Sequence, residues 1–519
     1  MVQAYPRTRA AIDREPRLVS RMPLRLRASI SALALAAFAA SCTKAVGESY
    51  PNQRPTAEAT PAPTTDPPTA TSPRGPCNID HPAFCEDFET PHPGGRGGDL
   101  DEAVWAFSRW GHETRQHFVR VPAGTETNRT ITSTFCGKPF SGVLLDQDVV
   151  SCDGIGVDGQ RSRQLNEVYD DQGDFAFNDM RVRQPFDFAG RTGTVTFDVD
   201  AKVNPYTLGH GWWVEMWITE DPAPMPYHES PGVVSYPRNG IGINFQGLNS
   251  CPQGRQATEI SRVFVTHEYK IVHDYPGWEL KHDSDDKRCF KIADAKLNRF
   301  KVLVDQKHLE VWASDYDDAA NLHRIAVAPV LDLPFSRGYL HLQHSQYNAR
   351  KDGNVTGVQT YRWDNVGFDG PRLPVPRASE VDDNVLPDID GAGGHMYGYA
   401  LSADKATTLR VKGVDLGGVA SASFDFSFLA NSGRGMIYRF NGGPPHSFTV
   451  PKFDREGLRG FSVEVPLSEL VTGNNTIDLT MQSPQTDHEE YIANAELTAI
   501  PNDSASGNRR TLVPNNAGR

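Results

Sequence analysis

The sequence lacks a long apolar run and lacks an excess of basic residues. No stretch reaches the roughly 18 apolar residues that a bilayer span requires, which excludes a multi-pass membrane protein. Across 519 residues, Lys+Arg 52 are outnumbered by Asp+Glu 65, and the formal net charge is −13. Proteins that bind phosphate backbones need a basic face, so the acidic balance argues against a nucleic-acid partner.

Motifs of several common enzyme classes are also missing. The chain has no Gly-x-Ser-x-Gly elbow, so a Ser-His-Asp hydrolase is not supported. It has no P-loop, which argues against a nucleotide-hydrolysing domain. It has no Cys-x-x-Cys pair, which leaves little basis for a structural zinc site.

Turn-forming residues are abundant, with Gly 45 and Pro 38, and this composition favours β-structure with many turns. From residue 77 onward, short alternating runs predict an all-β fold. Residues 194–202 place Val195, Phe197 and Val199 on one face of a strand. Residues 299–313 predict a hairpin with a polar tip at 305–308.

The N-terminus has the pattern of an export signal over residues 1–41, with Met22 as an alternative start. Arg25 and Arg27 precede the apolar residues 30–40, which have the length of a signal-peptide core. The following Ala39-Ala40-Ser41-Cys42 resembles a bacterial lipobox, which implies a lipid on Cys42, a membrane partner and a place in the cell envelope facing the periplasm or exterior. The alternative is an ordinary signal peptide with a nearby cysteine.

Residues 42–76 are predicted to be a tether between this anchor and the folded region. Positions 50–76 contain eight Pro and six Thr and almost no large apolar residue. Such a segment cannot bury enough surface to fold, and its prolines keep it extended.

The six cysteines after Cys42 fit an oxidising compartment, because an even number can pair completely. Proximity in sequence favours Cys77–Cys85, Cys136–Cys152 and Cys251–Cys289, although six cysteines allow 15 pairings. The remaining boundaries predicted from composition are a β region at 77–371, a linker at 372–395, a second β region at 396–500 and a disordered tail at 501–519.

The first β region resembles concanavalin A-like lectin and glucanase domains, a laminin-G-like jelly roll. The resemblance rests on residues 84–89 (FCEDFE), Trp105, the hairpin at 300–313 and the closing 363–366 (WDNV). It implies two antiparallel sheets, one of them concave and commonly holding a glycan. The second region, with 439–442 (RFNG) and 470–477 (LVTGNNTI), looks like a smaller galactose-binding or immunoglobulin-like sandwich.

Period-two alternation predicts which side chains face the groove. In the strand around 212–220, Val214, Met216 and Ile218 form the apolar set and leave the other residues for the opposite face. Aromatic rings stack on sugar C–H faces, and amides and carboxylates bind sugar hydroxyls. The candidate sugar-binding residues are Trp213, Trp217, Asn244, Gln246, Tyr339, His341 and Gln343. The alternative is a polar face covered by loops, with its tryptophans buried.

Two enzymatic alternatives accompany carbohydrate binding. Glu215 and Glu220 match the two glutamates of the Glu-x-Asp-x-x-Glu strand of laminarinase-type glycoside hydrolases, which implies a nucleophile and an acid/base, but Trp217 replaces the Asp. A retaining mechanism needs its two carboxyl groups about 5–5.5 Å apart. A resemblance to alginate-lyase-type jelly rolls implies roles for Gln246, His341 and Tyr339, without the family's Arg-rich strand.

A structural Ca²⁺ is the one metal that the resemblance suggests, held where the first and last strands meet. Glu86, Asp87 and Asp364 would supply its hard oxygen ligands. The alternative is that these carboxylates have no metal. The sequence therefore predicts an exported, lipid-anchored protein that binds a glycan, with hydrolase or lyase activity as the alternative.

Overall fold

In the computed structural model of the chain, the described residues form antiparallel strands and short 3₁₀ turns, η2 (Gly277–Glu279) and η4 (Leu467–Glu469). The prediction of an all-β fold is confirmed. The structure describes residues 75–90, 100–110, 118–121, 134–135, 138–139, 162–165, 175–199, 211–224, 228–230, 233–246, 257–282, 289–292, 296–347, 361–381, 385–386, 396–401, 406–430, 435–451, 457–482 and 490–502. The signal segment with Cys42, the tether up to residue 74 and Cys136, Cys152 and Cys251 lie outside them.

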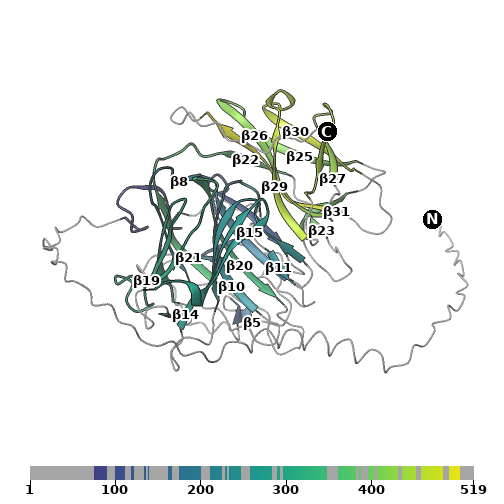
Figure 1. Ribbon diagram of the computed structural model, residues 1–519. Coiled ribbons are helices and arrows are strands. Elements are labelled where there is room, and N and C mark those ends of the chain that lie inside the picture. The colour runs from purple at the N-terminus through teal and green to yellow at the C-terminus, as the bar shows by residue number, and fades with distance from the viewer. Residues whose placement is uncertain are drawn as a thin grey trace, which may run out of the picture. The chain divides into compact units, whose positions relative to one another are not determined.

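The first β region forms two sheets, as the resemblance implied (Figure 1). In spatial order, the sheet with eight described strands contains β19 (His323–Ala328), β18 (Leu309–Ala313), β17 (Asn298–Val304), β9 (Gly193–Val199), β21 (Tyr361–Asp369), β6 (Ser162–Leu165) and β3 (Phe118–Val121), with β1 (Pro82–Glu86) beside β21. The predicted hairpin at 299–313 is confirmed as β17 and β18, which pair from Phe300↔Ala313 to Val304↔Leu309.

The second sheet of this sandwich has nine described strands. Their order is β15 (Lys270–Pro276), β14 (Ala257–His267), β13 (Gly240–Gln246), β10 (Gly211–Thr219), β20 (Arg337–Tyr347), β7 (Phe175–Val182) and β2 (Trp105–Trp110), with β16 (Phe290–Lys291) on β14 and β8 (Phe186–Asp187) on β20. Two short hairpins accompany the sandwich: β4 (Thr134–Phe135) with β5 (Lys138–Pro139), and β11 (His228–Ser230) with β12 (Val233–Ser235).

The core lies between these two sheets, because the alternating apolar side chains of both point inward. Phe197 of β9 and Phe300 of β17 stack with ring centroids 5.2 Å apart, and Phe245 of β13 meets Phe300 edge-on at 4.9 Å. All three rings are fully buried. Full burial of one such side chain contributes about 1.5–3 kcal/mol, so the two facing apolar sets hold the sheets together.

The first and last strands of the sandwich meet, as the sequence predicted. β1 pairs antiparallel with β21 from Phe84↔Phe368 to Glu86↔Val366, and the predicted disulfide Cys77–Cys85 is present beside them. A Cβ at Gly367 would lie 2.7 Å from the Cβ of Cys77, so a side chain there would collide with the disulfide. Cys289 is also disulfide-bonded.

The second β region forms a smaller sandwich of two further sheets, also as predicted. The larger sheet has β23 (Val385–Leu386), β24 (Met396–Leu401), β31 (Glu490–Pro501), β26 (Val419–Ala430) and β29 (Gly457–Val465), with β22 (Arg377–Glu380) on β31. The smaller sheet is β25 (Thr407–Val414), β30 (Gly473–Met481), β27 (Gly435–Phe440) and β28 (His446–Thr449). Because β22 and β23 pair with this sandwich, it begins inside the segment 372–395 that composition assigned to a linker.

Candidate functional site

Six polar side chains stand in one row across the nine-stranded sheet, on the face that points away from the core. Listed from β14 to β2, the polar row is Arg262, Asn244, Glu215, Gln343, Asp179 and Ser108, each the register partner of the next. Neighbouring strands lie about 4.8 Å apart, so the row spans about 24 Å. This length suits an extended ligand better than a compact one.

Strand alternation forces these residues outward. Val214, Met216 and Ile218 of β10 are buried in the core between the sheets. Since successive side chains of a strand point to opposite faces, Glu215 and Trp217 lie on the other face. Their predicted placement on one face is thereby confirmed by the packing of β10.

Polar groups in the row bond to one another. Asn244 donates its side-chain N–H to Glu215 Oε1 at 2.9 Å, and Ser108 donates its hydroxyl to Asp179 Oδ2 at 3.0 Å. Glu215 and Gln343 have no exposed surface, and Asn244 is 7% exposed. Groups that are held by such bonds while shielded from water are pre-organised for hydrogen bonding.

His341 lies two residues along β20 from Gln343 of the row, and its ring links Asp179 to Thr219. Its Nδ1 lies 3.0 Å from Asp179 Oδ2, and its Nε2 lies 3.0 Å from the hydroxyl of Thr219. Burial lowers the pKa of His341 below its ordinary value, although the adjacent Asp179 carboxylate acts in the opposite direction. Thr219 donates its own proton to the carbonyl of Asp221 at 2.8 Å, so this hydroxyl is not an activated nucleophile.

Trp217 is not the exposed platform that a sugar-stacking role required. It is 0% exposed and stacks on Phe264 of β14 with ring centroids 5.8 Å apart and planes 11° apart. Gly242 lies opposite Trp217 in the register, and a Cβ there would lie 2.4 Å from the indole ring. The tryptophan therefore packs in a small apolar cluster, which was the alternative interpretation of its pattern. The side chains of Trp213 and Gln246 lie outside the described part of the chain.

The paired glutamates of a retaining hydrolase are not assembled. β10 keeps a continuous register with both neighbouring strands through Thr219, so it has no bulge to bring Glu220 to the face of Glu215. Five residues along an unbulged strand separate the two positions by about 16 Å, three times the spacing that the mechanism needs. Glu220 instead accepts a hydrogen bond from Asn239 at 2.6 Å and pairs with Arg238 at 3.4 Å.

The three residues of the lyase interpretation are likewise spread along the sheet. The register pairs Phe245, the residue before Gln246, with Val214, and it pairs Tyr339 with Thr219. These levels are five residues apart on β10, or about 16 Å. Only His341 and Tyr339 remain neighbours, two residues apart on β20.

Sequence reasoning missed the charged residues that β7 adds to this face. Arg181 lies opposite His341 in the register, over the ring of Tyr339, and both Arg181 and Arg183 pair with Glu496 of β31. This contact joins the two sandwiches within the compact unit of residues 71–519. The alternation of charged residues with Met180 and Val182 is the signal that could have identified this strand face.

The expected Ca²⁺ ligands do not converge. Glu86 and Asp87 each accept a hydrogen bond from a nearby backbone N–H, that of Phe88 at 2.8 Å and that of Glu89 at 3.2 Å. Asp364 is buried on β21 and accepts the N–H of Asn365 at 2.8 Å. In the described part of the chain, no group of three or more His, Cys, Asp or Glu side chains could hold a metal ion.

Comparison with known proteins gives structural matches only. No family model and no curated protein sequence matches the chain. Among solved structures, it is similar to lectin I-B4 from Griffonia simplicifolia, with 12% identity over 40% of this chain and 87% of that chain and a TM-score of 0.24. It is similar to a β-1,3-glucanase from Mycobacterium marinum, with 15% identity over 56% and 98% and a TM-score of 0.27.

A third match is the exoplasmic/lumenal domain of VIP36 in its Ca²⁺/Man-bound form, with 12% identity over 41% of this chain and 79% of that chain and a TM-score of 0.24. The two sheets of the first β region themselves define its fold. Within the described residues, no helix has the length and apolar character needed to cross a membrane.

Proposed function

We propose that the chain binds a polysaccharide through the outward face of its nine-stranded sheet. The observation that carries this proposal is the polar row, which brings a carboxylate, two amides and a second carboxylate into register across four adjacent strands. Sugar hydroxyls both donate and accept hydrogen bonds, so they match carboxylates and amides together. A span of about 24 Å favours a polymer over a monosaccharide.

Access to the row is part of the proposal, because Glu215, Gln343 and Asp179 are almost fully shielded from solvent. A ligand can therefore reach these three side chains only by displacing the atoms that shield them from solvent. We expect hydrogen–deuterium exchange of β10 and β20 to change when a bound polysaccharide is present.

A glycan array and a pull-down with insoluble polysaccharides test the proposal. Wild type is compared with Glu215→Gln, which keeps an acceptor for Asn244 but removes the charge, and with Glu310→Gln on β18 of the other sheet as a matched control. Binding that is lost in the first variant and kept in the second supports the proposal. Binding that both variants keep, or no binding by wild type, contradicts it.

The pair of His341 and Asp179 favours a second candidate, proton transfer on the same bound glycan. A buried imidazole oriented by a carboxylate has the arrangement of a general acid or base. Product release by wild type and by Glu310→Gln that is abolished in His341→Gln, while this variant still binds the polysaccharide, would favour this lyase-like activity. Wild type that binds but releases no product leaves carbohydrate binding alone.

We further propose that the protein is a cell-envelope lipoprotein anchored through Cys42. The proposal rests on the apolar residues 30–40 and the lipobox-like sequence that follows them. Cys42→Ser should move the protein from the membrane fraction to the soluble fraction or stop its processing. A variant that fractionates as wild type does would contradict the anchor.

A further inference from the structure

The two sandwiches meet at the outward faces of their sheets. Arg181 of β7 and Arg183, just after it, continue the outward face that carries Asp179 of the polar row, and both pair with Glu496 of β31. Leu497 lies in the core of the second sandwich, so the adjacent Glu496 points away from that core. Arg181 is two residues from Asp179, or about 7 Å along the strand. The second sandwich therefore lies against the same face as the polar row, close to its β7 member.

Two further contacts join the sandwiches. A Cβ at Gly460 of β29 would lie 1.9 Å from the carbonyl oxygen of Pro224, which follows β10, so the two backbones touch there. The ring of Tyr269, in the turn between β14 and β15, lies 5.7 Å from the ring of Phe461 on β29. We call these two contacts and the ion pairs of Glu496 the joint.

The joint depends on charges whose hydrogen bonding is incomplete. Arg181 is 3% exposed and its Nη2 bonds to Glu496, but its Nε and Nη1 have no hydrogen-bond partner among the described residues. A buried donor without a partner destabilises the closed arrangement. Contacts between domains that rely on polar groups resemble transient interfaces, for which relative motion is the default expectation.

The connector between the sandwiches, residues 370–376, leads directly to the joint. It runs from β21 to β22, and β22 pairs with β31, where Glu380 lies opposite Glu496. Gly370, its first residue, has a φ of 114°, which glycine adopts readily and other residues rarely do. A rotation of the connector therefore carries Glu496 with it.

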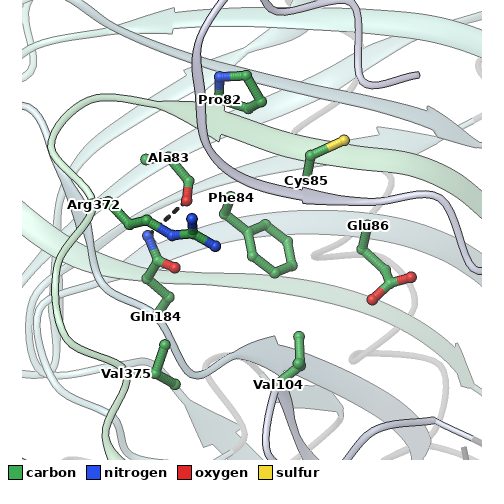
Figure 2. Close-up of a pocket in the computed structure, with 9 residues that line it drawn as sticks. All are labelled: Pro82, Ala83, Phe84, Cys85, Glu86, Val104, Gln184, Arg372 and Val375. Atoms are coloured by element: carbon green, nitrogen blue, oxygen red, sulfur yellow. Dashed lines mark hydrogen bonds between the residues drawn. The ribbon is translucent and has the colours of Figure 1, made fainter. Parts of the chain in front are cut away.

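The connector also has open space beside it. A pocket of about 400 Å³ lies between the connector and β1, and it is lined by residues 82–86, Val104, Gln184, Arg372 and Val375. Figure 2 shows Arg372 and Val375 on one side of the Phe84 ring and Glu86 on the other. Hinge residues must change their backbone angles, and this space allows the connector to do so without a clash with β1.

We propose that the second sandwich is a hinged cover of the polar row, which turns about residues 370–376 and opens the joint when a polysaccharide binds. The closed joint lowers the apparent affinity, because only the open fraction of the molecules is competent to bind. The effect on polysaccharide binding rests on the proposed function, whereas the opening of the joint does not.

Two variants open the joint by different means. Gly460→Ala adds a methyl group that collides with the Pro224 carbonyl and touches no residue of the polar row. Glu496→Gln removes the charge that holds Arg181 and Arg183. The matched control is Gly417→Ala in the same sandwich, where a Cβ would meet only the Asp415 carboxylate, at 3.2 Å.

The first measurement follows opening without a ligand. Phenylglyoxal modifies accessible arginines, and mass spectrometry of the full mature chain locates the modified sites. Arg181 should react at least about tenfold faster in both joint variants than in wild type, because its reactivity follows the open population, and Gly417→Ala should react as wild type does. Urea denaturation of the same samples verifies that each variant is folded. Wild-type reactivity of Arg181 in both folded joint variants would overturn the hinge.

The second measurement is the Kd for laminarin, galactomannan and alginate. For a polysaccharide that wild type binds, both joint variants should lower the Kd about tenfold, and Gly417→Ala should leave it unchanged. An unchanged Kd in variants whose Arg181 reacts faster would show that the second sandwich is no cover. A higher Kd in both would make it part of the binding site, which also contradicts the inference. If even the opened variants bind none of the three probes, the proposed function fails together with the cover, while the Arg181 reactivity still reports the hinge.

Discussion

The first sandwich carries the polar row on its nine-stranded sheet, and the second carries a buried polar face on β26, β29 and β31. In the second, three hydroxyl groups converge on one carboxylate: Ser423, Ser462 and Thr498 all donate to Asp425. The polar row contains instead two carboxylates, two amides, a guanidinium and a hydroxyl. Apart from the partly exposed Arg262, both sets of side chains are buried, so burial alone does not separate a binding face from a structural one.

The difference lies in the kinds of side chain that each face presents, since donors of both faces are used within the chain. The hydroxyl protons of the second face are donated within the chain to Asp425, which makes this cluster a closed structural unit. The polar row presents charges of both signs and amides in register over about 24 Å. We conclude that the variety and alignment of the side chains, and not their burial, mark the polar row as the candidate binding face.

The largest effect that tests this comparison is expected at Trp217, which lies beside the polar row. Truncation of a buried aromatic leaves a cavity, so Trp217→Ala should lower the free energy of unfolding by about 3–5 kcal/mol, measured by urea denaturation. Trp312→Ala on β18, whose ring is only partly buried, is the control and should cost less. Equal costs would show that the Trp217 ring is not buried in its cluster with Phe264.

The pH dependence of the stability that Asp425 contributes tests the structural role of its cluster, which the polar row does not share. Burial and the neighbouring Glu496 raise the pKa of Asp425 to about 7, against the opposing effects of Arg181, Ser462 and Thr498. The folded state then binds the Asp425 proton more tightly than the unfolded state does. The stability that protonated Asp425 contributes is therefore fully present below about pH 4 and is lost as pH rises through about 7.

Asp425→Asn should remove this dependence. The stability of wild type relative to the variant should fall by up to about 4 kcal/mol between pH 4 and pH 8. Thermal unfolding of both proteins across that range measures the difference. Parallel curves would mean that Asp425 has an ordinary pKa and that the hydroxyl groups hold an ionised carboxylate.

Glu496 joins the two polar faces, and its substitution tests whether they are coupled. Glu496→Gln leaves Arg181 and Arg183 without their carboxylate and should cost about 3 kcal/mol, since an unmatched buried charge is strongly destabilising. Glu464→Gln, at an exposed position of β29, is the control and should cost little. If the two variants are equally stable, the ion pairs do not hold the sandwiches together.

The smallest stability effect is expected within the polar row. Glu215→Gln preserves the shape and the acceptor for Asn244, so it should change the free energy of unfolding by less than about 1.5 kcal/mol while it impairs glycan binding. Denaturation and a polysaccharide pull-down on the same sample separate the effect on stability from the effect on glycan binding. A large loss of stability with binding intact would assign Glu215 to the structure, like Asp425.

Much of the fold could be predicted from the sequence, because alternation is a local property. The hairpin of β17 and β18, the meeting of β1 with β21 and the Cys77–Cys85 disulfide are all confirmed. Alternation also identified the faces of β10 and β20. The register between strands is not local, and it is the register that brings Asp179 into line with Gln343.

Alternation could not show what covers a face. It placed Trp217 correctly on the outward face, but exposure depends on the neighbouring strands, where Gly242 leaves room for the indole and Phe264 stacks on it. It also could not show whether β10 contains a bulge, on which the pairing of Glu215 with Glu220 depended. Both features require knowledge of the partner strands.

The dependence of affinity on ligand length tests the central claim most directly. Oligosaccharides of two to six units, taken from a polysaccharide that wild type binds, are titrated by calorimetry. If the polar row is the binding face, affinity should rise at least about tenfold from the disaccharide to the hexasaccharide, and Glu215→Gln should abolish that rise. The same affinity at every length, or a rise that Glu215→Gln retains, would contradict the account.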